Sequence, residues 1–202
     1  MIYLIITTSI NNVHGAANAS HRKKRYIESI QASLKYITSD IKPIIVENNG
    51  ARETYLDNLG CDVLYTNTNN TSFKKGEKEM RDIQAVIQKY NINDDDTVIK
   101  LTGRYRLLGD ALIKLIKERP DMDAFVKFFN VSTLTFDSHD CALGLFAIKA
   151  KYLKTLRYPN KTSPEKEFVA YVRYNIKKEH IYEITDLQLE CCFAEDLRLV
   201  TV

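Results

Sequence analysis

Apolar residues in the first hundred positions alternate between short continuous runs and runs with helical spacing. Residues 2–6 are all apolar and are followed by Thr7, Thr8 and Ser9, a pattern typical of a central strand buried on both faces. Further strands are predicted over residues 42–46, 63–65 and 97–101, and helices over residues 22–39, 52–59 and about 76–90. This alternation predicts βαβ units and a largely parallel sheet.

The second half follows a different pattern, with several apolar runs separated by short connections. Strands are predicted over residues 124–131, 133–136, 143–148 and 184–193, and helices over residues 108–117 and 165–177. Short connections favour antiparallel neighbours. No linker, repeat or low-complexity segment divides the chain. The sequence therefore predicts a single α/β domain over residues 1–202, with a mixed, mostly parallel central sheet flanked by helices and antiparallel additions in the second half.

Composition narrows the class of protein. The 202 residues carry 29 basic and 26 acidic side chains, a formal net charge of +3, interspersed along most of the chain. This balance argues against a nucleic-acid partner. The four cysteines show no Cys-x-x-Cys spacing, so neither a zinc site nor a disulfide framework is expected. The apolar start is too short for a signal peptide and no run approaches a membrane span, so we expect a soluble cytoplasmic protein.

Polar residues follow each of the four predicted parallel strands. They are Thr7, Thr8 and Ser9, then Glu47, Asn48 and Asn49, then residues 66–70, and finally Thr102, Gly103, Arg104 and Tyr105. Ligands of open α/β sheets bind beyond these carboxyl ends. No Gly-rich dinucleotide fingerprint or Walker loop is present, which disfavours classical dinucleotide binding and P-loop hydrolysis.

Cationic side chains are the remaining candidates for a phosphate site. Arg25 lies in the dense basic run 21–25, which opens a predicted helix and is either a solvated helix start or a phosphate contact. Lys75 and Gly76 open another helix, where solvated structure is the simpler interpretation. Gly103 interrupts a buried strand beside Arg104, which indicates close approach of a ligand or of another backbone, or else a bulge with Arg104 in solvent.

These motifs together resemble a known family. The strings 5–8 (Ile-Ile-Thr-Thr), 45–50 (Ile-Val-Glu-Asn-Asn-Gly), Asn70-x4-Lys75-Gly76-x2-Glu79 and 100–105 (Lys-Leu-Thr-Gly-Arg-Tyr) are similar to those of small GT-A-fold glycosyltransferase-like proteins of bacterial surface-polysaccharide loci and large DNA viruses. The resemblance rests mainly on the first hundred residues. It implies a hexosyltransferase of polysaccharide biosynthesis, placed in the host cytoplasm if viral, with a nucleotide-sugar-binding half (1–107) and an acceptor-side half (108–202).

The resemblance also implies roles for individual residues. Thr7, Thr8 and Glu47 are placed near the base and ribose, and Arg25, Lys75 and Arg104 near the diphosphate. The full nucleotide-sugar-binding set is Thr7, Thr8, Ser9, Arg25, Glu47, Asn48, Lys75, Gly76, Lys100, Gly103, Arg104 and Tyr105.

One departure from the family concerns the metal. GT-A enzymes commonly place Asp-x-Asp after the fourth strand to hold a divalent cation, and this chain has Thr102-Gly103-Arg104 there. The acidic run 94–96 precedes the strand, at the wrong end of the sheet, and reads as a solvated turn. A Mn²⁺ or Mg²⁺ requirement is therefore left open, and Arg104 with Lys75 offers the positive charge that a metal otherwise supplies.

Candidate acceptor-side groups lie in the second half. Asp137, His139 and Asp140 can take a proton from an acceptor hydroxyl, and the alternative is an Asx turn between strands. Glu165 and Glu167 follow Pro164, where carboxylates stabilise a helix start, and this structural role is preferred for both.

The sequence thus predicts a glycosyltransferase that moves a sugar from a nucleoside-diphosphate sugar to a hydroxyl of a glycan acceptor. A nucleotidyltransferase or other phosphoryl-handling enzyme would use the same strand ends, and would bind a metal through Asp137 and Asp140. A nucleotide- or sugar-binding module without catalysis is the third possibility.

Overall fold

The central sheet begins with the four parallel strands that the sequence predicts. The computed structural model describes residues 1–10, 19–50, 54–194 and 196–202. Strand β1 (Ile2–Thr8) lies between β2 (Ile41–Glu47) and β4 (Thr97–Thr102), with β3 (Asp62–Tyr65) at the edge. All three pairings are parallel, and their register places Thr8 beside Glu47 and Thr7 beside Thr102. The carboxyl ends of these strands therefore form one polar edge.

Three further strands extend the sheet beyond β4. They are β7 (Leu145–Lys149), β6 (Ala124–Val126) and β8 (Ile181–Glu183), which complete the order β3-β2-β1-β4-β7-β6-β8. β7 pairs antiparallel with both β4 and β6, whereas β6 and β8 are parallel. In this sheet the antiparallel addition is thus one reversed strand.

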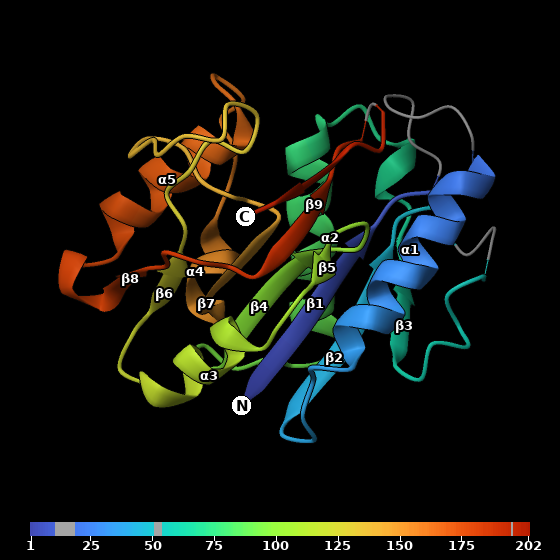
Figure 1. Cartoon of the computed structure of the whole chain (residues 1–202), viewed down its shortest axis with the longest axis horizontal. Coiled ribbons are helices and arrows are strands. Elements are labelled where there is room, and N and C mark those ends of the chain that lie inside the picture. The colour runs from blue at the N-terminus through green and yellow to red at the C-terminus, as the bar shows by residue number, and fades with distance from the viewer. Residues whose placement is uncertain (11–18, 51–53, 195) are drawn as a thin grey trace.

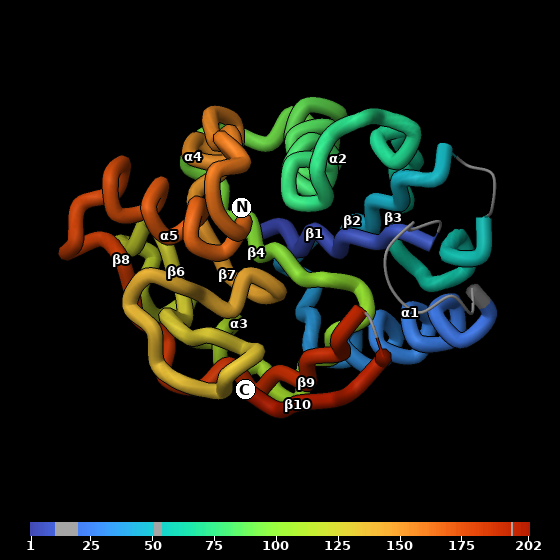
Figure 2. Tube along the Cα trace, turned by 90° about the horizontal axis from the view of Figure 1, so that it is seen from above, coloured from blue at the N-terminus to red at the C-terminus, as the bar shows by residue number. Residues whose placement is uncertain are grey.

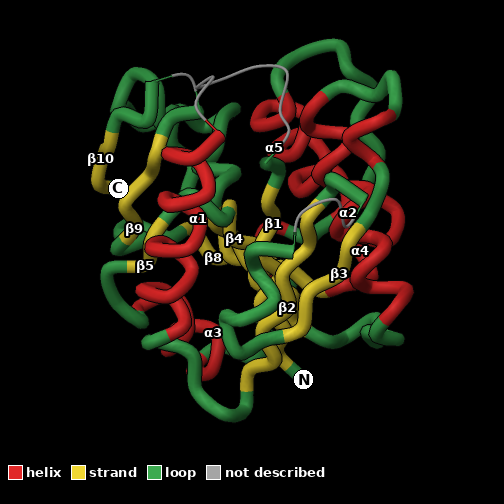
Figure 3. Tube along the Cα trace, turned by 90° about the vertical axis from the view of Figure 1, so that its right-hand side faces the viewer, coloured by secondary structure: helices red, strands yellow, loops and turns green. Residues whose placement is uncertain are grey.

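Helices cover both faces of the sheet (Figures 1 and 2). On one face α2 (Lys75–Lys89), α4 (Ala150–Thr155) and α5 (Pro164–Asn175) share a core with Tyr3 and Ile5 of β1. On the other face α1 (Ala19–Leu34) and α3 (Ala111–Glu118) share a core with Leu4 and Ile6. Figure 3 shows α1 and α2 on opposite sides of the strands. Alternate residues of β1 point to opposite faces, which explains why a continuous apolar run was needed.

A small second sheet lies on the α1 side. It consists of β5 (Arg106–Leu107), β9 (Leu189–Cys192) and β10 (Leu199–Thr201), in the order β10-β9-β5 with antiparallel pairing. Two short 3-10 helices, Thr68–Asn70 and Lys178–His180, complete the described elements. The β5–β9 pairing brings the segment after β4 against the C-terminal strand, and it determines where Arg104 lies.

Several predicted elements differ from the structure. The helix expected over 52–59 is wrong in its described part, where residues 55–58 form turns, and residues 52 and 53 lie outside the described ranges. Residues 131–134 form turns, and the 133–136 run contributes a single bridge between Thr135 and Asn130, because the segment turns back on itself. The strand expected over 184–193 is confined to 189–192 and belongs to the small sheet. The acidic run 94–96 is a turn, as expected, and Asp96 accepts the N-terminal ammonium at 2.6 Å.

Candidate functional site

Three adjoining cavities follow the carboxyl ends of β1 and β4. Their volumes are about 530, 320 and 430 Å³, and we call them the first, second and third cavities. Lys75 and Arg104 line all three, Glu79 lines the first two and Glu165 the last two. We refer to the three together as the groove. It lies where ligands of open α/β sheets bind.

The first cavity is strongly basic. Five cationic side chains line it, namely Arg22, Lys74, Lys75, Lys78 and Arg104. Three of them come from the start of α2, at the positive end of the helix dipole. Asp82 and Glu79 are the two acidic side chains among its lining residues. An anionic ligand is therefore favoured by charge as well as by the helix end.

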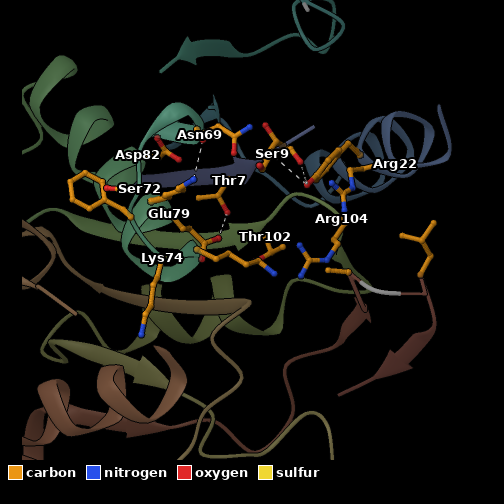
Figure 4. Close-up of a pocket in the computed structure, with 17 residues that line it drawn as sticks. Thr7, Ser9, Arg22, Asn69, Ser72, Lys74, Glu79, Asp82, Thr102 and Arg104 are labelled. Atoms are coloured by element: carbon orange, nitrogen blue, oxygen red, sulfur yellow. Dashed lines mark hydrogen bonds between the residues drawn. The ribbon is translucent and has the colours of Figure 1, made fainter. Parts of the chain in front are cut away.

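Glu79 is neutralised within the protein. Its Oε1 accepts the Thr7 hydroxyl at 2.6 Å (Figure 4). The same oxygen lies 3.0 Å from the ammonium of Lys100, a side chain that is only 2% exposed. Lys100 also donates to Thr102 Oγ1 at 2.7 Å and to the carbonyl of Leu143 at 3.0 Å. Burial alone would raise the pKa of Glu79, but the Lys100 ammonium and the Thr7 hydroxyl hold that pKa below its usual value. Lys75 adds to this lowering, so Glu79 lies between the buried Lys100 ammonium and the cations of the first cavity.

Asp82 lies in the first cavity beside Glu79 (Figure 4). Its carboxylate accepts the hydroxyls of Thr66 and Thr68, each at 2.6 Å, and the side-chain amide of Asn48 at 3.3 Å. Burial raises the pKa of Asp82 to about 6, although the two hydroxyls favour the charged form. Asp82 thus links α2 to the ends of β2 and β3 and fixes one wall of the cavity.

Arg104 is held from two sides. Its Nε donates to the carbonyl of Cys192 in β9 at 2.6 Å, and its own carbonyl accepts Arg25 Nε at 2.8 Å and Ser29 Oγ at 3.2 Å. Arg25 in turn forms an ion pair with Glu190 at 2.9 Å. Arg25, predicted to contact the diphosphate, therefore supports the backbone of Arg104 and is not among the residues that line the groove.

Gly103 lies directly against the end of β1. Its N–H donates to the carbonyl of Thr7 at 2.8 Å. A Cβ at this position would lie 2.6 Å from Thr8 Cγ2 and 3.0 Å from the Thr7 carbonyl oxygen. The glycine thus admits the end of β1, the second of the alternatives that the sequence left open, and brings Arg104 next to Thr7 and Thr8.

Two residues that were predicted to bind the nucleotide sugar, Glu47 and Asn48, lie beneath the site. Glu47 is fully buried, and its carboxylate accepts the N–H of Ile10 and the hydroxyl of Tyr55, both at 3.2 Å. Burial raises the pKa of Glu47. Asn48 is buried and donates to Asp82. Eight of the twelve predicted donor residues line the groove: Thr7, Thr8, Ser9, Lys75, Gly76, Lys100, Arg104 and Tyr105.

The predicted catalytic loop reaches the groove with one of its three residues. Asp140 lines the third cavity, is buried, and accepts the Asn130 side-chain amide at 3.0 Å and the Cys141 N–H at 2.7 Å. Asp137 accepts the His139 N–H at 2.9 Å, which is an Asx turn, and the His139 side chain is 82% exposed. Asp137 and His139 are not among the residues that line the three cavities, so their catalytic role stays a prediction.

Glu165 is the lining residue that the sequence interpretation treated as structural. It lines the second and third cavities from the first turn of α5. Glu167, two residues later, does have the expected structural role and accepts the N–H groups of Asn160, Lys161 and Thr162. No sequence signal separates the two glutamates, because both occupy a helix start. Arg22, Lys74, Lys78 and Asp82 were also missed as individual lining residues.

The donor set does not fit a divalent cation. Within the described ranges, no group of three or more His, Cys, Asp or Glu side chains could hold a metal ion. The position that follows β4 carries the guanidinium of Arg104, and the neighbouring carboxylate of Glu79 is paired with Lys100. Hard cations require several oxygen ligands. The described residues thus form no cage of protein ligands for a divalent cation, and Lys75 and Arg104 supply positive charge at the groove.

Comparison with known proteins gives a fold. No protein-family model matches the sequence, and no curated protein matches it. Among solved structures, CMP:2-keto-3-deoxy-manno-octonic acid synthetase in complex with CTP is similar, with a TM-score of 0.52, 9% identity and coverage of 91% of this chain and 89% of that one. A protein of Desulfovibrio desulfuricans G20, provisionally assigned as a nucleotide-diphospho-sugar transferase, has a TM-score of 0.58, 10% identity and coverage of 91% and 79%. Bifunctional IspDF from Campylobacter jejuni has a TM-score of 0.57, 11% identity and coverage of 91% and 49%.

These likenesses show a nucleotide-diphospho-sugar transferase-like fold, in agreement with the predicted α/β architecture. At this level of identity they establish the fold alone. In the part of the chain that the structure describes, none of the helices is long and apolar enough to cross a lipid bilayer. Function must therefore be argued from the groove.

Proposed function

We propose that this protein transfers a sugar from a nucleoside-diphosphate sugar to a hydroxyl group of a glycan acceptor. The observation that carries the proposal is the position of Lys75 and Arg104, which line all three cavities of the groove. A diphosphate between these two cations has room on one side, in the first cavity, for a nucleoside. On the other side the second and third cavities have room for the sugar and the acceptor.

The lining of each cavity supports this division. The first cavity has about the volume of pockets that bind nucleotide-sized ligands and is lined by Thr7, Thr8 and Ser9 beside the cations. The second contains Tyr105, whose ring packs on Gly144, so that a Cβ there would lie 2.0 Å from Tyr105 Cε2. Aromatic faces commonly pack against sugar rings. The third is polar and carries Asp140 and Glu165.

The reaction needs charge stabilisation where the bond breaks. As the anomeric carbon separates from the diphosphate oxygen, negative charge accumulates on the leaving group, and Lys75 and Arg104 are positioned to stabilise it. Arg104 does not need to reorganise for this, since Cys192, Arg25 and Ser29 already fix it. We therefore propose that donor binding does not depend on Mn²⁺ or Mg²⁺.

A thermal-shift screen tests the proposal. The purified protein is mixed with UDP-, GDP-, ADP-, dTDP- and CMP-linked sugars, each with EDTA and with Mn²⁺. A ligand at about 100 times its Kd adds roughly 2.7 kcal/mol, and each kcal/mol moves the Tm of a chain of this size by roughly 2–4 °C. We expect one nucleotide class to raise Tm by about 5–10 °C in EDTA, and the same donor to release its nucleotide when acceptors are added. A shift without release under any condition would indicate a binding module.

Nucleotidyl transfer is a second candidate, favoured by the fold shared with the synthetase that was crystallised with CTP. It would consume a nucleoside triphosphate and release pyrophosphate. The metal site it predicts at Asp137 and Asp140 is not supported by the geometry, since Asp137 belongs to an exposed turn and Asp140 bonds Asn130. Pyrophosphate release from triphosphates, measured beside nucleoside diphosphate release from nucleotide sugars, separates the two reactions.

A further inference from the structure

Four carboxylates line the groove, and three of them have partners in the protein. Glu79 is bonded to Lys100 and Thr7, Asp82 to two threonine hydroxyls and Asn48, and Asp140 to Asn130 and the Cys141 N–H. A general base needs a lone pair that is available to the acceptor hydroxyl. Asp82 and Asp140 use both oxygens to hold the site together, and Glu79 is paired through Oε1 with the Lys100 ammonium, which lowers its basicity.

Glu165 differs from the other three. It lines the second and third cavities, the side of the groove opposite the nucleoside, and is half-buried. Within the described residues no hydrogen bond or ion pair of its carboxylate is found, whereas its backbone carbonyl accepts the Cys141 thiol at 3.6 Å. Its carboxylate therefore keeps its lone pairs.

The start of α5 does not need Glu165 as a cap. Ser163 caps the helix by accepting the Lys166 N–H, and Pro164 occupies the first turn without an N–H to satisfy. Glu167 faces away from the groove and binds three successive backbone N–H groups of residues 160–162. Two glutamates of one helical turn thus have different surroundings, one bound into the protein and one directed to the cavities.

Resting on the proposed function, we propose that Glu165 is the general base of sugar transfer. Its carboxylate takes the proton of the acceptor hydroxyl as the acceptor oxygen forms a bond with the anomeric carbon. The bond from the anomeric carbon to the diphosphate oxygen breaks, and its electron pair leaves with the nucleoside diphosphate, held by Lys75 and Arg104. The displacement is single, so the configuration at the anomeric carbon inverts.

The test compares Glu165→Gln with a matched change elsewhere. Glu118→Gln makes the same substitution at an exposed position at the end of α3, outside the groove. The donor that gives the largest thermal shift is used, with methyl hexosides or water as acceptors. General-base catalysis contributes about 10²–10⁴-fold. We expect Glu165→Gln to bind this donor within about 2-fold of the unchanged protein and to lose roughly 100-fold or more in turnover, while Glu118→Gln keeps both.

A second variant removes the ambiguity of a structural effect. In Glu165→Ala, added formate can take the place of the missing carboxylate, and we expect it to restore part of the turnover. A folding defect would not respond to formate. The product of the unchanged protein, followed by NMR, should have the inverted anomeric configuration.

The outcomes distinguish the two proposals. Turnover of Glu165→Gln within about 3-fold of the unchanged protein, or a product with retained configuration, overturns the role of Glu165 and leaves the sugar transferase in place. Loss of turnover in Asp140→Asn but not in Glu165→Gln assigns the base to Asp140 instead. Absence of nucleoside diphosphate release from every donor by the unchanged protein overturns the proposed function, and with it the base.

Discussion

The two helices that open onto the groove carry opposite charges at the same kind of position. At the start of α2, three lysines (Lys74, Lys75 and Lys78) and one acidic residue, Glu77, surround the positive end of the helix dipole, and no side chain caps the helix. At the start of α5, Ser163 caps the helix and glutamates occupy the first turn. Cations at a helix N-terminus are unfavourable by about 0.3–1 kcal/mol each, whereas carboxylates there are favourable.

This difference teaches how to interpret charge at a helix start. The lysines of α2 act against the stability of their helix. Lys74 and Lys78 donate to the backbone carbonyls of Asn160 and Asn69, but these acceptors carry no net charge, so an anionic ligand would still stabilise this helix start. The glutamates of α5 stabilise the start of their helix, and this structural role alone explains them. A glutamate with a function therefore cannot be recognised at this position from the sequence pattern. A residue that opposes its local preference is the more informative signal, as expected where binding competes with folding.

The largest expected effect comes from removing the shared cations. Arg104→Ala and Lys75→Ala each delete a charge-assisted contact worth about 1.5–3 kcal/mol, so each should weaken binding of the nucleotide sugar by roughly 10- to 100-fold and the double variant by more. Isothermal titration calorimetry in EDTA measures both. Lys89→Ala is the matched control, since Lys89 is exposed at the other end of α2. We call the cations at the start of α2, together with Arg104, the basic wall. Unchanged affinity in both single variants would contradict the basic wall as the diphosphate site.

The buried ion pair below that wall should dominate stability. Lys100→Met removes the ammonium that faces Glu79 at 3.0 Å and leaves a carboxylate without its counter-charge. Breaking a buried pair costs about 3–5 kcal/mol, and partial exposure of Glu79 places the expected loss near about 3 kcal/mol in urea unfolding. Adding Glu79→Gln to Lys100→Met should recover part of the loss. A double variant no more stable than Lys100→Met would argue against the pair as the cause.

Asp82 gives the basic wall a pH dependence. Its pKa of about 6 in the folded protein lies above the usual 3.8, so the protonated form favours folding. The contribution of Asp82 to the free energy of unfolding should therefore rise as the pH falls from about 7 to 4.5, by about 2 kcal/mol at 1.36 kcal/mol per pKa unit. Urea unfolding of the unchanged protein and of Asp82→Asn at both pH values measures it. Asp82→Asn is a suitable comparison because the buried Asn48 Oδ1 has no hydrogen-bond partner in the described structure. Once the Asn48 side-chain amide rotates by 180°, this oxygen can accept from the new amide at position 82. Parallel pH profiles for the two proteins would refute the shift.

Local patterns were sufficient to predict most of the half of the fold that holds the basic wall, the exception being the helix expected over residues 52–59. The apolar run of β1 and the helical spacing of α2 are set by neighbours in sequence, and the parallel order follows from their alternation. The polar strand ends then identified Thr7 and Arg104, and the predicted helix start identified Lys75; all three line the groove. Gly103 signalled a close approach, and the structure identifies the approaching backbone as β1.

The support of Arg104 and the α5 side of the groove depend on contacts between residues far apart in the sequence, which no local pattern encodes. Arg25 is bonded to Glu190, 165 positions later, and the small sheet pairs Arg106 with Glu190, 84 positions later. Without that pairing, Arg25 looked like a free phosphate ligand. The groove position of Glu165 likewise follows from how α5 packs on the sheet. Such long-range packing is fixed only by the whole chain.

The smallest expected effect tests the contact between α2 and α5, the two helices whose starts line the groove. Gly76 of α2 packs directly on Pro164 of α5, and a Cβ at Gly76 would lie 2.6 Å from Pro164 Cγ. Alanine is favoured over glycine within a helix by about 1 kcal/mol, but overpacking costs about 1–3 kcal/mol. Gly76→Ala should therefore destabilise the protein by about 1 kcal/mol in urea unfolding. Pro164→Gly removes both Cγ and Cβ, the two atoms that a Cβ at Gly76 would meet at 2.6 and 2.8 Å, so in that background the same substitution should be neutral or stabilising. An equal loss in the free energy of unfolding in the two backgrounds would show that α2 and α5 are not coupled through this contact. The spacing between the lysines of α2 and Glu165 would then be determined by other contacts.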